Sequence, residues 1–166
     1  DWILIDSRAG LADPAGALLG GLSHLIVLFG TSANASWAGL RIVLGRLGSA
    51  RLRRGVPQAD CLLVHGMVTT RASEDARRAF IDRSRDEYED TYYAAEPACA
   101  DERKEEIWYL GDAESSDAPH VPATLHYSDL LAFFDRLPSV ADRLAEDPDY
   151  VALAERIATR FGRRKA

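Results

Sequence analysis

A carboxylate that could act on a bound phosphate follows the first apolar segment of the chain. Residues 2–5 read Trp-Ile-Leu-Ile, and Asp6 comes directly after them. Short continuous apolar runs are typical of buried parallel strands, and open α/β sheets bind ligands at the carboxyl ends of such strands. There, Asp6 could hold a Mg²⁺-bound water or polarise an attacking water. A strand-to-helix turn with an aspartate cap explains the same residues equally well.

The residues after Asp6 favour a site for phosphate without assigning one. Gly10 lacks a Cβ, so its backbone can approach a phosphate closely. Arg8 could contact that phosphate or pair with a neighbouring acid, and the sequence leaves both alternatives open. Because the spacing D-x-x-x-G is short and common, it does not identify a site by itself.

The other residues that could do chemistry form no catalytic or metal-binding pattern. Cys61 and Cys99 lie in no C-x-x-C or Cys/His spacing and are too few for a disulfide framework, so we expect reduced thiols in a cytoplasmic protein. No lysine-bearing glycine loop of the form G-x-x-x-x-G-K-[ST] occurs. His65 and His126 could each border a bound base, although a satisfied structural histidine explains each more simply.

Apolar periodicity places these residues on alternating strands and helices. Strands are predicted at residues 2–5, 24–29, 61–68 and 107–110. Helices are predicted at residues 14–22, 36–47, 73–93, 127–137 and 149–161, with Tyr88, Tyr92 and Tyr93 facing inward. Such alternation favours an α/β fold, in which a mostly parallel sheet carries helices on both faces. The sequence therefore predicts a single α/β domain over residues 1–166.

Composition excludes some classes of protein and partner. The chain has 166 residues, of which 47% are hydrophobic and 28% charged, so we expect a folded domain rather than a disordered chain. Its formal net charge of -6 disfavours general attraction to nucleic acid, and no nucleic-acid partner is predicted.

The segment from Asp6 to Gly10, after its apolar strand, resembles the switch segment of the MinD/ParA family of P-loop ATPases. That family has a strand ending in Asp, a small or polar pair, and then Ala-Gly at this point. The likeness continues in order through residues 25–29, 31–36, 39–41 and 62–64, and it resumes weakly at residues 120–122. It covers most of the chain and is specific over about the first third.

The resemblance implies a three-layer, P-loop NTPase-like fold with ATP and Mg²⁺ as cofactors. It assigns the catalytic role to Asp6, which would also hold the Mg²⁺ through water. It assigns cofactor-binding roles to Ser7, Arg8, Gly10, His65 and Pro122. No guanine signature follows residues 61–68, so adenine is favoured. The family's phosphate-binding loop lies upstream of the Asp6 strand, so we expect an N-terminally incomplete domain that binds ATP weakly or not at all by itself.

The expected partners are a nucleotide and a second copy or another protein. Dimerisation around nucleotide is implied by the resemblance alone. An alternative hypothesis is a catalytically silent interaction module that uses the charged helix at residues 73–93 to bind partners. The amphipathic segment at residues 150–161, followed by a basic tail, could touch an anionic membrane peripherally. Core packing of this segment is favoured over membrane contact.

Overall fold

The computed structural model describes residues 2–6, 22–50, 60–69, 71–94, 115–133, 136 and 138–163. Several sequence predictions lie outside these ranges. They are the strand at residues 107–110, all but the last residue of the helix at residues 14–22, and the switch residues Ser7, Arg8 and Gly10.

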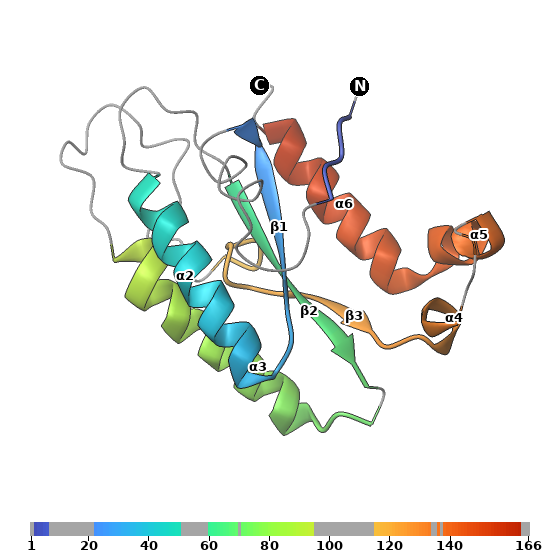
Figure 1. Ribbon diagram of the computed structural model, residues 1–166, viewed down its shortest axis with the longest axis horizontal. Coiled ribbons are helices and arrows are strands. Elements are labelled where there is room, and N and C mark those ends of the chain that lie inside the picture. The colour runs from blue at the N-terminus through green and yellow to red at the C-terminus, as the bar shows by residue number, and fades with distance from the viewer. Residues whose placement is uncertain are drawn as a thin grey trace.

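Three parallel strands form an open sheet in the order β1-β2-β3 (Figure 1). The strands are β1 (Leu25–Gly30), β2 (Asp60–Val68) and β3 (Ala123–His126). β1 pairs with β2 from Leu25 opposite Asp60 to Gly30 opposite His65. The first two strands confirm the predictions for residues 24–29 and 61–68, and the parallel sheet with its helices confirms the α/β class.

One face of the sheet is covered by α2 (Asn34–Ala50), α3 (Glu74–Tyr88) and the π-helix η2 (Glu89–Tyr93). Ser73 begins α3 by accepting a hydrogen bond from the Ala76 N–H, as Ser does at helix N-caps. The buried cluster on this face comprises Leu28, Trp37, Leu40, Leu44, Leu47, Cys61, Leu63, Phe80, Tyr88, Tyr92 and Tyr93. The predicted helices at residues 36–47 and 73–93 are confirmed, as are the inward-facing tyrosines.

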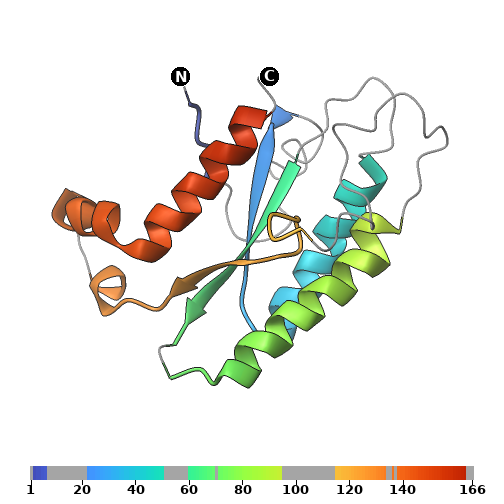
Figure 2. The ribbon, with the colours of Figure 1, turned by 180° about the vertical axis from the view of Figure 1, so that it is seen from behind.

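The opposite face is covered by α6 (Pro148–Arg163) (Figure 2). Leu62, Val64 and Leu125 of the sheet form a buried cluster with Leu153 of α6. Helices therefore lie on both faces, as predicted, and α6 confirms the helix expected at residues 149–161. Its Leu153 and Ile157 pack against the sheet, which is the core role favoured for this segment.

The predicted helix at residues 127–137 was wrong in extent. The structure has a short α4 (Asp129–Ala132) and then α5 (Pro138–Glu146). Proline suits the first turn of a helix and interrupts one further along, so Pro138 starts a new helix. No helix in the described part of the chain is long and apolar enough to cross a membrane.

The strand predicted at residues 2–5 is wrong. Residues 2–6 have no regular secondary structure, and Ile3 and Leu4 are each 87% exposed. An apolar run indicates a tendency to be buried, but strand formation needs a neighbour to supply hydrogen bonds and a covering layer. Conversely, β3 was not predicted, because its four residues are too few for their apolar/polar alternation to distinguish a strand from a loop.

A buried arginine joins α6 to the amino end of β2. The Arg160 side chain is 1% exposed, and its guanidinium donates to the Cys61 carbonyl at 2.6 Å and to Asp60 Oδ1 at 3.1 Å. The same guanidinium contacts Asp117, through Oδ1 at 3.4 Å and through the backbone carbonyl. This network fixes the amino ends of the strands, opposite the edge at which ligands of parallel sheets bind.

Candidate functional site

The strand ends bring three segments to one edge of the sheet. Because β1, β2 and β3 are parallel, their carboxyl ends lie on the same side. We call residues 31–33, 65–69 and 126–128 the carboxyl edge. Ligands of open α/β sheets bind at this side, so the carboxyl edge is the candidate site.

A serine and a histidine contact each other at the carboxyl edge. Ser32 Oγ lies 3.2 Å from His65 Nε2. The β1–β2 register places Gly30 opposite His65, so the loop that follows Gly30 runs beside the imidazole. Ser32 is exposed, whereas His65 is only 7% exposed. The serine hydroxyl is therefore open to solvent while its partner is shielded.

The surroundings of His65 keep its imidazole neutral. Its ring stacks on Phe80 of α3, with centroids 3.6 Å apart and planes 5° from parallel. Burial lowers the pKa of His65 below the ordinary value of 6.5, and the charges of Arg77 and His126 lower it further. A neutral imidazole can accept a proton at one nitrogen, so His65 has the protonation state of a base at neutral pH.

The loop between β1 and α2 is held by its own hydrogen bonds. The Thr31 N–H donates to Ser36 Oγ at 3.0 Å, and the Ser36 N–H donates to the Ala33 carbonyl at 3.0 Å. The Ser36 hydroxyl thus ties the loop to the first turn of α2. Ser32 is thus presented on an ordered loop.

A second imidazole is fixed at the end of β3. His126 Nδ1 lies 2.7 Å from Asp149 Oδ2, and the His126 backbone N–H donates to the same oxygen at 2.9 Å. Asp149 stands in the first turn of α6, where its own N–H donates to Asp147 Oδ1. His126 is therefore a satisfied histidine, as favoured from the sequence.

Backbone strain occurs at the same edge. Met67 adopts φ 57°, in the left-handed region that non-glycine residues rarely enter, and its side chain is 67% exposed. The pairing of β2 with β3 is irregular between His65 and Val68. Unfavourable backbone conformations of this kind cluster at ligand sites.

Cys61 is not a candidate nucleophile. Burial, followed by the charge of Asp60, raises the pKa of the Cys61 thiol to about 12. Its Sγ lies 3.8 Å from the Tyr88 hydroxyl within the core. A protonated, buried thiol is inert as a nucleophile or metal ligand.

Of the predicted site residues Asp6, His65 and Pro122, which the structure describes, only His65 lies at the carboxyl edge. Asp6 is exposed and follows a segment without regular structure, so the strand end that suggested its role is absent. Pro122 precedes β3, in which Ala123 pairs with Val64, so it lies toward the amino side of the edge. The predictions for Ser7, Arg8 and Gly10 lie outside the described residues.

Ser32 and Asp149 were missed from the sequence. Ser32 directly follows the predicted strand end and its Gly30-Thr31 pair, and that position was the available signal. Its partner could not be found, because the contact depends on the β1–β2 register. Within the described ranges, no group of three His, Cys, Asp or Glu side chains could hold a metal ion.

Comparisons with protein-family models, with curated proteins and with solved structures found no match.

Proposed function

We propose that the chain is part of a MinD/ParA-type nucleotide-binding domain of the P-loop NTPase class, with ATP and Mg²⁺ at the carboxyl edge. The switch-like segment at residues 6–10 supports this proposal, as do the two following parallel strands with a helix between them. These elements occur in the order that the resemblance implies. In this proposal the protein is cytoplasmic and hydrolyses ATP only when a phosphate-binding loop is joined to it.

The observation that supports the proposal most is the edge of β1 that pairs with no strand in the described part of the chain. β1 reads Leu-Ile-Val-Leu-Phe-Gly, and among the described residues it pairs only with β2. Phe29, on the same face as Leu25 and Val27, is 63% exposed, so helices of the described part of the chain leave this end of the face uncovered. Parallel strands this apolar are normally central and covered, and an exposed apolar edge invites pairing with another strand. We infer that β1 is an inner strand of a larger sheet, whose added strands bring the phosphate-binding loop to the carboxyl edge.

The proposed roles follow from what each residue can reach. His65 would border the base with its ring edge, because Phe80 covers one ring face. Asp6 follows a segment without regular structure here, so it would act on Mg²⁺ through water only if an added strand paired with residues 2–6. The described residues form no metal site by themselves, so the ion would arrive with the phosphates. ATP binding by this chain alone is therefore expected to be weak or absent.

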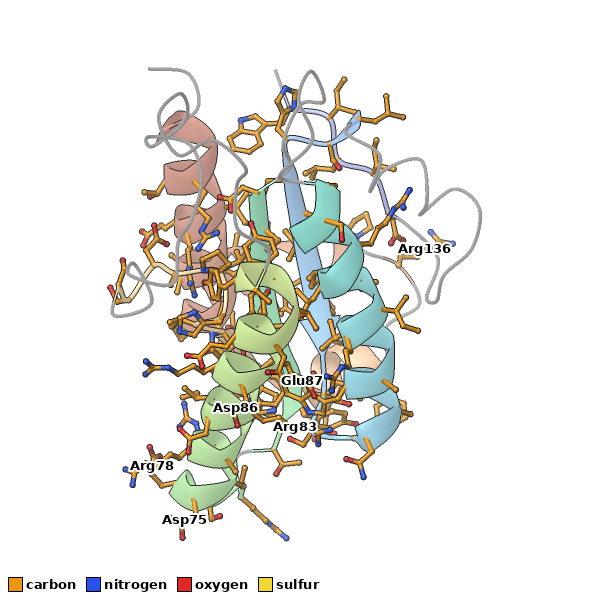
Figure 3. The ribbon with its side chains drawn as sticks, turned by 90° about the vertical axis from the view of Figure 1, so that its left-hand side faces the viewer. Asp75, Arg78, Arg83, Asp86, Glu87 and Arg136 are labelled. Atoms are coloured by element: carbon orange, nitrogen blue, oxygen red, sulfur yellow. The ribbon has the colours of Figure 1, made fainter. Side chains whose placement is uncertain are left out.

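The alternative, a silent interaction module, rests on the outer surface of α3. Figure 3 shows Asp75 and Arg78 pointing away from the body of the molecule. Other charged residues pair within the chain: Arg41 of α2 lies 3.5 Å from Glu87 of α3 and 3.5 Å from Asp90 of η2. A protein partner would then contact α3 at its outer surface, the side that carries Asp75 and Arg78. This alternative is the weaker one, because Glu87 of the same helix is already paired with Arg41.

Calorimetric titration with Mg-ATP tests the proposal. The 166-residue chain should show little or no heat of binding, whereas a longer chain that includes an upstream lysine-bearing glycine loop should bind at about micromolar Kd. Light scattering of the longer chain with and without Mg-ATP would show whether two copies associate. Tight binding by the 166-residue chain, or no binding by the longer chain, would contradict the proposal.

A further inference from the structure

Ser32 and His65 have the geometry of a nucleophile beside its base. An exposed hydroxyl lies 3.2 Å from the Nε2 of a shielded imidazole. Hydroxyl nucleophiles are weak unless a base within hydrogen-bonding distance accepts their proton. With its proton on Nδ1, the neutral His65 ring presents Nε2 as that acceptor.

We propose that Ser32 and His65 form a nucleophile–base pair that accepts an acyl group from an activated ester, an activity that needs no nucleotide although it uses the histidine placed beside the base in the proposed function. Ser32 Oγ attacks the acyl carbon while its proton passes to His65 Nε2. The ester C–O bond then breaks, and the leaving alkoxide takes that proton from Nε2. In the second half, water attacks the acyl-serine with its proton passing to Nε2, which returns it to Ser32 Oγ as the carboxylic acid departs.

The start of α2 supplies donors for the charge that develops in this reaction. Ser32 lies two residues before α2 (Asn34–Ala50), with Ala33 between them. The first N–H groups of a helix have no acceptor within it, so those of Asn34 and Ala35 can donate to a negative oxygen. Donors of this kind stabilise the tetrahedral intermediate of acyl transfer.

Burial and neighbouring charges make His65 suitable as the base. Phe80 of α3 covers one ring face, and the charged groups that act on the ring are Arg77 of α3 and His126 at the end of β3. Burial and these two charges disfavour the imidazolium form of His65. The ring therefore stays unprotonated at pH values at which an exposed histidine would already be protonated. Within the described part of the chain no carboxylate bonds to His65, and we therefore expect slow turnover limited to activated esters.

Labelling with a fluorophosphonate probe and hydrolysis of p-nitrophenyl acetate test the pair without any nucleotide. Mass spectrometry should place the adduct on Ser32. Ser32→Ala should abolish that adduct, and His65→Gln should slow both labelling and hydrolysis by at least roughly tenfold. Ser49→Ala is the matched control, because Ser49 is an exposed serine on α2 bonded to the Gly45 carbonyl. It should react like the native chain.

The pH profile of the native chain gives a result that does not depend on the variants folding. Labelling should rise with a midpoint below 6.5, the ordinary histidine pKa, and then stay level to about pH 8. A rate that climbs steadily with hydroxide would overturn the proposal, because it indicates an unassisted serine. Adducts on other serines only, or His65→Gln labelling as fast as the native chain with an unchanged melting temperature, would overturn it as well.

Discussion

His126 Nδ1 lies 2.7 Å from Asp149 Oδ2, and this one carboxylate oxygen also accepts the His126 backbone N–H at 2.9 Å. The contact joins the carboxyl end of β3 to the first turn of α6. Because both elements lie beside the candidate site, the pair determines how the end of β3 is placed at the carboxyl edge.

Removing this carboxylate should destabilise the fold. Asp149→Ala leaves the His126 donors without their acceptor, and we expect the free energy of unfolding to fall by about 1–3 kcal/mol. Urea denaturation of the native chain and the variant measures this difference. Asp142→Ala, at an exposed position on α5, is the control and should change stability by less than about 0.5 kcal/mol. Equal effects of the two substitutions would contradict the role of Asp149.

Two glycines of α2 should respond oppositely to alanine. At Gly48 an added Cβ would lie 2.5 Å from the Thr91 carbonyl oxygen, so Gly48→Ala should destabilise by about 1–3 kcal/mol through overpacking against η2. At Gly45 nothing lies within 4 Å, and Gly45→Ala should stabilise by about 0.5–1 kcal/mol through helix propensity. Thermal melts of the two variants measure these opposite changes in stability. A stabilising Gly48→Ala would mean that α2 and η2 are not packed as described.

Arg160 should contribute strongly to stability at the amino end of the sheet. Arg160→Met leaves Asp60 without its buried cation and Asp117 with Arg156 alone, and breaking a buried pair in this way costs about 3–5 kcal/mol. Guanidinium denaturation should show the loss. Arg78→Met, at an exposed position on α3, serves as control and should be nearly neutral. A neutral Arg160→Met would show that the network is dispensable.

Stability should depend on pH through His65. Because burial lowers the pKa of folded His65 below 6.5, the unfolded chain binds a proton first as the pH falls. Protonation of His65 therefore does not reduce stability above about pH 6.5. As the pH falls from there toward the lower folded-state pKa of His65, the free energy of unfolding decreases. Chemical denaturation between about pH 7.5 and pH 5 should show a shallower pH slope for His65→Gln than for the native chain. Identical slopes would contradict this.

The elements that sequence predicted best are those with a strong local pattern. β1 is an uninterrupted apolar run, β2 is an apolar run interrupted by His65 and Gly66, and α3 is a charged helix that buries Phe80 and Tyr88. Residues 2–5 show the same apolarity as β1 yet form no strand, because pairing is decided by distant segments rather than by composition. β3 is too short for periodicity to distinguish it from a loop.

The candidate site could be predicted only in part for a related reason. His65 was singled out because it lies near the end of a clear strand. Its contact with Ser32 depends on Gly30 lying opposite His65, and a shift in register would separate the two side chains. Asp149 was recognised as the start of a helix, but its bond to His126 joins residues that are distant in sequence.

The location of a bound nucleotide tests the central claim most directly. A longer chain that carries an upstream lysine-bearing glycine loop, as the proposal requires, would be photolabelled with 8-azido-ATP and digested, and the labelled peptides would be identified by mass spectrometry. We predict labels in residues 65–69 and 126–128 of the carboxyl edge, suppressed by excess unmodified ATP. Labels confined to the outer surface of α3 or to the amino ends of the strands, or labelling that excess ATP does not suppress, would contradict it.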